Sequence, residues 1–187
     1  ASFINNSEVV VETSEKKEQI QFKNCIIASG STAAMLPNLP LDHPLVLTSK
    51  TALDLDDVPG SLLIIGGGII GLELGQVYST LGTDVSVVEY MPSLIPGADD
   101  DIAKPLIRKL KKHFKSIMLS SKVTNVDVGF EEGVRVSIES NNEIKDQVYD
   151  KVLVSIGRKP NTKLLSLENT DIKIDSKGFI IVDDYQK

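Results

Sequence analysis

Three glycines in one short segment are the residues of this sequence best suited to chemistry. Gly66, Gly68 and Gly71 stand in the stretch GGGIIG, between an apolar run and a helical pattern. Glycines at this spacing allow a tight turn, let the backbone approach a pyrophosphate, and let the helix pack closely on the strand before it. The helix N-terminus then offers unpaired N–H groups and a partial positive charge to the phosphates. The pattern predicts a dinucleotide site, although a glycine-rich turn between a strand and a helix is often only a turn.

An acidic residue stands where a dinucleotide site needs one. Glu89 ends a second apolar run, residues 85–88, and follows the glycines by about 20 residues. Its carboxylate can accept hydrogen bonds from both ribose hydroxyls of the adenosine and would repel a 2′-phosphate. Tyr90, Met91 and Pro92 follow it without a lysine or arginine that could bind that phosphate. The sequence therefore predicts NAD rather than NADP, and the alternative is that Glu89 is a solvated residue at a strand end.

The elements that position these residues follow the order strand, glycine turn, helix, strand, acid, which is that of a dinucleotide-binding βαβ unit. Further along, β-rich segments separated by turn residues predict a three-stranded meander, followed by one more buried strand. These segments are residues 123–128, 133–138, 144–149 and 151–156. The predicted fold class is α/β, a Rossmann-like parallel sheet with helices and a three-stranded β-meander.

Two other segments carry predictions about packing. Residues 24–28 are predicted to form a strand that buries Cys25, the only cysteine, as a core thiol. Residues from 99 onward are predicted to form a helix on which Ile102, Leu106 and Leu110 share one apolar face.

The composition bounds the class of protein. The chain has 187 residues, 41% of them hydrophobic, which suffices for one well-buried core. Its formal net charge of −6 argues against nucleic acid or an anionic membrane as the main partner. No apolar stretch reaches transmembrane length, since glycines and Glu73 interrupt the strongest one. With one cysteine, and with His43 and His113 far apart in sequence, no metal site is predicted.

Six segments together resemble the flavoprotein disulfide reductases and, within that family, the dihydrolipoyl dehydrogenases. In family order they are IIASGS at 26–31, LLIIGGGIIGLELG at 62–75, LGTDVSVVE at 81–89, IPGADDDI at 95–102, KVTNV at 122–126 and VLVSIGRKPNT at 152–162. The resemblance implies that residues 1–57 are part of an FAD-binding domain with a connector. It implies further that residues 58–182 form the NAD-binding domain and that residues 183–187 begin the return to the FAD domain.

The resemblance also implies which residues contact the two dinucleotides. For NAD these are Gly66, Gly67, Gly68, Ile69, Ile70, Gly71, Leu72, Glu73, Glu89, Val123 and Gly157. Near FAD they are Ala28, Ser29, Gly30 and Arg158. Glu73 would reach the nicotinamide carboxamide, and Ile69 would shield the flavin until NAD displaces it. Four of these residues have a purely structural alternative: Glu73 is favoured by the helix dipole, Ile69 is part of the core packing, Val123 is an apolar strand residue, and Arg158 is a surface arginine paired with an acid.

The family reaction passes electrons from dihydrolipoamide through a redox disulfide to FAD and then, as hydride, to NAD. This chain holds neither the two cysteines nor the His-Glu pair of that reaction, so we expect an internal fragment without catalytic residues, inactive alone. The implied partners of the full-length protein are the lipoyl domains of 2-oxoacid dehydrogenase complexes and a second, identical subunit. The implied location is the cytoplasm, or the mitochondrial matrix in a eukaryote. The alternatives are a related reductase, such as a mercuric reductase or a transhydrogenase, or a non-enzymatic NAD-binding module.

Overall fold

The computed structural model describes residues 1–36, 39–40, 42–130 and 133–187. Backbone contacts divide these residues into two compact units, which are described separately. The smaller unit holds residues 1–32 and 158–187, and the larger unit holds residues 33–157. The domain boundaries near residues 57 and 182 concern the full-length protein and stay a prediction.

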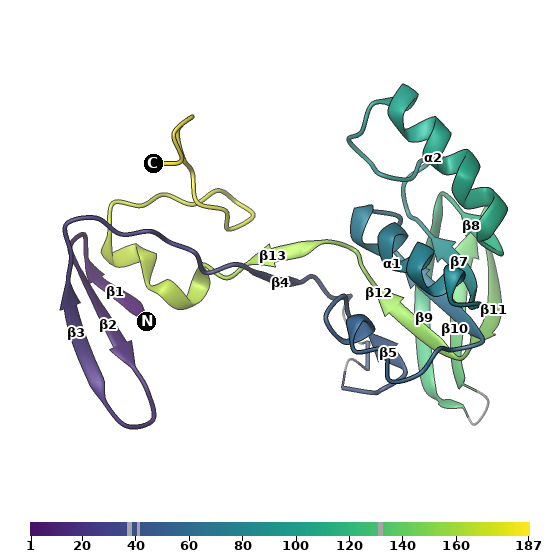
Figure 1. Cartoon of the computed structure of the whole chain (residues 1–187), viewed down its shortest axis with the longest axis horizontal. Coiled ribbons are helices and arrows are strands. Elements are labelled where there is room, and N and C mark those ends of the chain that lie inside the picture. Colours follow the sequence, from purple (N-terminus) through teal and green to yellow (C-terminus); the bar gives the residue numbers. More distant parts are fainter. Residues whose placement is uncertain (37–38, 41, 131–132) are drawn as a thin grey trace. The chain divides into compact units, whose positions relative to one another are not determined.

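The larger unit is built on a five-stranded sheet in which every neighbouring pair of strands is parallel (Figure 1). The strand order is β5-β12-β6-β7-β8. The strands are β5 (Val46–Leu47), β6 (Ser61–Ile65), β7 (Asp84–Val88), β8 (Ser116–Met118) and β12 (Lys151–Val154). Because β6 lies between β7 and β12, the chain leaves β6 where the strand order reverses. Open α/β sheets bind their ligands at such a point.

Alternating side chains of the sheet supply two separate cores. Leu62 and Ile64 of β6 belong to the core formed with the helices, whereas Leu63 and Ile65 belong to the core formed with the meander. The helices are α1 (Ile69–Thr80) and α2 (Asp100–His113), and the meander consists of β9 (Ser121–Phe130), β10 (Gly133–Ser140) and β11 (Glu143–Tyr149). Successive side chains of a strand point to opposite faces, so one strand serves both layers. The predicted α/β fold with a parallel sheet and a meander is confirmed.

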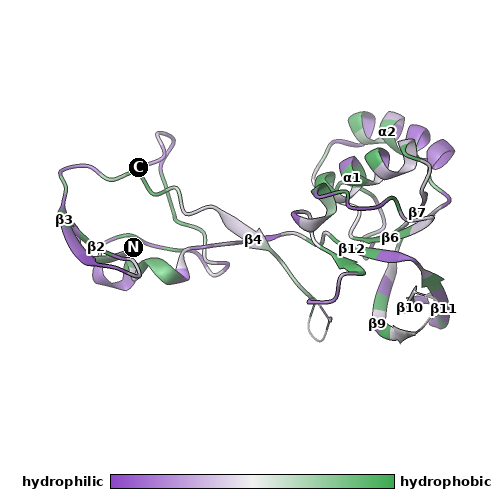
Figure 2. Cartoon of the chain, turned by 60° about the horizontal axis from the view of Figure 1, so that its bottom comes forward, coloured by the Kyte–Doolittle hydropathy of each residue, from purple (hydrophilic) through white to green (hydrophobic). Residues whose placement is uncertain are grey.

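The smaller unit contains short elements. An antiparallel sheet is formed by β1 (Ser2–Asn5), β2 (Glu8–Glu12) and β3 (Lys17–Gln21). Every residue of β3 is exposed, and Figure 2 colours this strand as mainly hydrophilic. The 3₁₀ helices η2 (Lys163–Leu165) and η3 (Leu167–Asn169) follow β13 (Arg158–Pro160), which pairs with β4 (Ser31–Ala33).

The predicted strand at residues 24–28 is wrong. Within the part of the chain that the structure describes, these residues pair with no strand, and Cys25 is exposed rather than buried. The neighbouring Ile26 is 93% exposed. An apolar run has the composition of a buried strand, but it becomes one only where a neighbouring strand pairs its backbone and a second layer covers its side chains.

The helix predicted from residue 99 onward is confirmed as α2, but its buried face differs from the prediction. Ala103 and Leu110 are buried, whereas Ile102 is 70% exposed. Leu106 and Ile107 pack partly buried against the core. The helical period fits both sets of positions, and the orientation of α2 over the sheet decides between them. Across the described ranges, neither α1 nor α2 nor any other helix has the length and apolar character needed to cross a membrane.

Tyr78 joins α1 to the 3₁₀ helix η1 (Thr51–Leu53), because its hydroxyl donates a hydrogen bond of 2.8 Å to the carbonyl oxygen of Ala52. Burial raises the pKa of the Tyr78 phenol, and the same cause raises the pKa of Tyr149. A phenol whose pKa is higher in the folded than in the unfolded state stabilises the fold. This stabilisation is fully present below the unfolded-state pKa, about 10, and is lost as the pH rises through the folded-state pKa.

We therefore expect the free energy of unfolding to decline above about pH 10. Tyr78→Phe should lower this free energy by about 1 kcal/mol at pH 7, since the Ala52 carbonyl loses its donor, and should flatten the decline at high pH. Urea unfolding between pH 7 and 11 measures both effects. Tyr90→Phe, at a residue that is exposed, is the control that should change neither. An equally steep decline in Tyr78→Phe would contradict the burial argument.

Candidate nucleotide-binding site

The turn after β6 and the first turn of α1 each have a geometry that requires a glycine. Gly66 has φ +106°, and a Cβ on it would lie 2.6 Å from the carbonyl oxygen of Ser155. A Cβ on Gly71 would lie 2.4 Å from Oγ of Ser155 and 2.6 Å from the carbonyl oxygen of Gly66. The helix α1 thus begins directly against the end of β6. The packing roles predicted for Gly66 and Gly71 are confirmed, and their contact with a nucleotide stays a prediction.

The N-terminus of α1 is uncapped. Gly68, the N-cap residue, has an extended backbone, no side chain caps the helix, and its first turn holds no acidic residue. A Cβ on Gly68 would meet nothing within 4 Å, so the space beside it is open. Unpaired N–H groups beside open space suit an anion.

Four predicted residues of α1 lie in different surroundings. Ile69 is exposed at the start of the helix, and Glu73 is exposed further along it. Ile70 is partly buried against the core. The side chain of Leu72 lies in the core, and its N–H already donates to the carbonyl oxygen of Gly68 at 3.1 Å.

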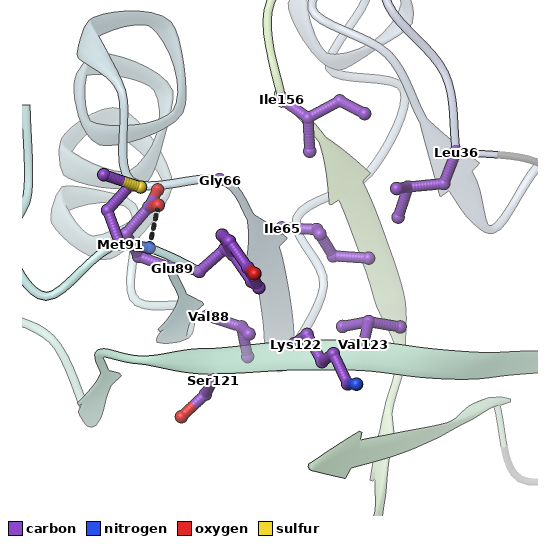
Figure 3. Close-up of a pocket in the computed structure, with 11 residues that line it drawn as sticks. Leu36, Ile65, Gly66, Val88, Glu89, Met91, Ser121, Lys122, Val123 and Ile156 are labelled. Carbon is purple, nitrogen blue, oxygen red and sulfur yellow. Dashed lines mark hydrogen bonds between the residues drawn. The ribbon is translucent and has the colours of Figure 1, made fainter. Parts of the chain in front are cut away.

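Glu89 is held by backbone groups on both sides. Its Oε2 accepts a hydrogen bond of 2.6 Å from the N–H of Gly67. Its Oε1 accepts one of 2.7 Å from the N–H of Met91, which Figure 3 marks with a dashed line. The residue is only 7% exposed. The alternative of a solvated strand-end residue is therefore wrong. Each carboxylate oxygen still has a lone pair available for a further donor.

A pocket of about 260 Å³ opens beside Glu89. It is lined by Leu36, Ile65, Gly66, Val88, Glu89, Tyr90, Met91, Ser121, Lys122, Val123 and Ile156. The structure thus brings together Gly66, Glu89 and Val123, three of the predicted NAD contacts. The pocket lies at the carboxyl ends of β6 and β7, and Figure 3 shows mainly apolar side chains on the wall that Val123 and Ile156 share with Leu36 and Ile65.

The sequence reasoning missed several lining residues. Tyr90 follows the predicted Glu89 in the sequence, and Lys122 precedes the predicted Val123. These neighbours are the sequence signal that could have indicated both lining residues. Leu36 comes from a connector that shows no periodic pattern, and nothing in the sequence places it at this pocket. Lys122 reaches the pocket from β9, far along the chain from the residues directly after Glu89.

The predicted residues near FAD lie in the smaller unit. Arg158 donates from Nε to Oγ of Ser31 at 2.7 Å and from an Nη to the Ser31 carbonyl at 2.5 Å. Its hydrogen-bond partner among the described residues is therefore a serine, where the structural alternative expected an acid. Asn161 donates to the carbonyl oxygens of Ser29 and Gly30 at 3.0 and 3.1 Å. Ala28 is exposed.

In the larger unit, the last predicted NAD contact, Gly157, is exposed, with φ +129° and open space around its Cβ position. Among the described residues, no group of three or more His, Cys, Asp or Glu side chains could hold a metal ion.

Comparison with known proteins decides the family. Residues 2–187 match the model of the pyridine nucleotide-disulphide oxidoreductases. The chain belongs to this family. It is 43% identical over 182 residues to the dihydrolipoyl dehydrogenase of Vibrio cholerae, and the aligned residues cover 97% of this chain and 38% of that relative. It is 39% identical over 184 residues to the mitochondrial dihydrolipoyl dehydrogenase of Dictyostelium discoideum, with 97% and 38% covered.

Solved structures agree with the fold. The Cu(II) complex of the HOCl-induced flavoprotein disulfide reductase RclA from Escherichia coli matches with a TM-score of 0.84 at 30% identity, covering 97% of this chain and 40% of that chain. The chain therefore spans less than half the length of the relatives it matches. The resemblance drawn from the six motifs is confirmed at the level of the family. Pyridine nucleotide and flavin, the two cofactors that it implied, are those of this oxidoreductase family.

Proposed function

We propose that the pocket beside Glu89 binds the adenosine half of NAD. The observation that carries the proposal is the buried carboxylate of Glu89, oriented by the N–H groups of Gly67 and Met91 at the edge of an apolar pocket. The two ribose hydroxyls would donate to the free lone pairs of this carboxylate. A 2′-phosphate would instead meet a like charge, so NAD is preferred over NADP.

The rest of the site accommodates the other parts of NAD. Adenine, a flat and weakly polar group, fits against Val123 and Ile156, with the aromatic ring of Tyr90 nearby. The pyrophosphate takes the open space at the uncapped N-terminus of α1. Towards the nicotinamide, Glu73 binds the carboxamide and Gly157 lets the backbone approach closely. Ile69 covers the flavin face until NAD arrives.

The wider proposal is that the chain is the NAD-binding part of a dihydrolipoyl dehydrogenase. The names of its curated relatives support this assignment over a mercuric reductase or a transhydrogenase. When bound, FAD supplies the redox chemistry between the disulfide and NAD, while the protein supplies binding and orientation. Ala28, Ser29, Gly30 and Arg158 then lie near FAD. Lipoyl domains, a second subunit and a cytoplasmic or mitochondrial matrix location belong to the same proposal for the full-length protein.

Calorimetric titration of the 187-residue chain with NAD and with NADP tests the proposal. We expect NAD to bind at least about tenfold more tightly than NADP, because only the 2′-phosphate distinguishes them and it faces Glu89. Tighter binding of NADP would contradict the assignment. The same chain should not oxidise dihydrolipoamide, and robust turnover would contradict the view that the chemistry needs residues outside it.

A further inference from the structure

An ion pair stands at the wall of the adenosine pocket. Lys122 is the one lysine or arginine among the described residues that line this pocket. Its Nζ lies 3.1 Å from Oε2 of Glu139. The two residues are register partners on β9 and β10, so the pair runs directly across the two strands. Opposite charges in such positions attract each other and orient both side chains.

The pair determines what charge the pocket offers to a ligand. Glu89 contributes one negative charge at the ribose position. Lys122 has a flexible four-carbon stem and could turn its ammonium towards a phosphate bound beside Glu89. While Glu139 holds that ammonium, the positive charge of Lys122 is offset and its donors are directed along the meander. The pocket is then left with the uncompensated charge of Glu89.

We propose that Glu139 is a specificity-determining residue: by holding Lys122 in an ion pair, it withholds from the pocket the cation that a 2′-phosphate would need. This inference rests on the proposed NAD site. Glu89 rejects the 2′-phosphate directly, and Glu139 rejects it by occupying the group that could compensate. The pair is half-exposed, with the Lys122 side chain 50% accessible, so it adds little to stability. Its effect is on which nucleotide binds.

The test compares Glu139→Gln with the unmutated chain by calorimetric titration with NAD and NADP. In Glu139→Gln, Lys122 is free to form a charge-assisted contact with the 2′-phosphate, and we expect the Kd for NADP to fall about three- to tenfold. The Kd for NAD, which lacks this phosphate, should stay within about twofold. The gain should disappear in the double variant Lys122→Met/Glu139→Gln and should shrink as salt is raised.

Glu143→Gln is the matched control, because it removes the same charge from another acid of the meander, which pairs with Lys145 at 3.2 Å. It should leave both Kd values unchanged. If Glu139→Gln does not fold, Glu139→Thr replaces it, since threonine suits a strand and also lacks the charge.

The outcomes separate the inference from the proposed function. If the unmutated chain binds neither nucleotide, or prefers NADP, the proposed NAD site is wrong. If it prefers NAD and the ratio of the two Kd values is the same in the Glu139 variants, the NAD site stands and the role of Glu139 is overturned. A gain in NADP affinity that persists without Lys122 would also overturn that role.

Discussion

Replacing Gly71 with valine is expected to lower the free energy of unfolding of the larger unit by about 3 kcal/mol. A Cβ at this position would lie 2.6 Å from the carbonyl oxygen of Gly66 and 3.0 Å from a methyl group of Ile64. Neither neighbour can turn away easily, because one is backbone at the end of β6 and the other is packed in the core. The start of α1 would have to move off the sheet. Urea unfolding followed by circular dichroism measures the loss.

The same shift would also disturb two hydrogen bonds that the Ser155 hydroxyl donates to the end of β6 and to the turn before α1. Oγ of Ser155 lies 3.1 Å from the carbonyl oxygen of Gly66 and 3.2 Å from that of Ile65, and it is the atom nearest to the Gly71 Cβ position. Gly68→Ala is the control, since its Cβ would meet nothing within 4 Å, and we expect it to cost about 1 kcal/mol or less. Equal stability of Gly71→Val and Gly68→Ala would contradict the close approach of α1 to β6.

Glu89→Arg is expected to weaken NAD binding about a hundredfold, because both ribose hydroxyls lose their acceptor and face a positive charge instead. NADP should lose much less, since its 2′-phosphate gains a partner, so the preference for NAD should narrow or invert. Glu89→Gln should have a smaller effect, about tenfold on NAD, because its amide keeps one acceptor oxygen. Calorimetric titration with both nucleotides measures these changes.

Both variants should also lower the free energy of unfolding, because the N–H group of Gly67, that of Met91, or both lose the carboxylate oxygen that accepts their hydrogen bond. The loss should be about 1 to 3 kcal/mol for each buried donor left unpaired. Binding must therefore be measured at a temperature where circular dichroism shows the variant to be folded. Unchanged NAD affinity in a folded Glu89→Arg chain would rule out Glu89 as the ribose acceptor.

The βαβ unit could be predicted because its signals are local. The glycine spacing, the apolar runs on either side and the acid at residue 89 all lie within about 30 residues of one another, the length of one such unit. The sequence could not predict that the Glu89 carboxylate is buried and held in one orientation. Its burial depends on how the turn at Gly67 and the chain at Met91 close around it. Hydrogen bonds of this kind have no periodic signature.

The residues that the sequence did not predict, or predicted wrongly, depend on contacts between distant segments. Lys122 reaches the pocket because Ser121 donates its N–H to the carbonyl oxygen of Glu89 at 3.0 Å, which fixes β9 beside the end of β7. The predicted burial of Cys25 is wrong because an apolar run in the sequence does not reveal whether another strand will pair with it. The predicted place of Ile102 on the packed face of α2 is wrong, because a helical period indicates an apolar face but not the rotation of the helix over its sheet.

The two hydrogen bonds that the Glu89 carboxylate accepts from the backbone N–H groups of Gly67 and Met91 restrict how this site can evolve. A carboxylate that only contacted the ribose could be exchanged freely when selection favoured another nucleotide. Here the carboxylate also closes the turn that presents the helix N-terminus, so under the proposed ribose role one substitution would alter both nucleotide selectivity and the free energy of unfolding. Lineages that change their nucleotide are expected to acquire a replacement acceptor for Gly67 before, or together with, the loss of this acid. Ancestral reconstruction across the family can reveal that order of events.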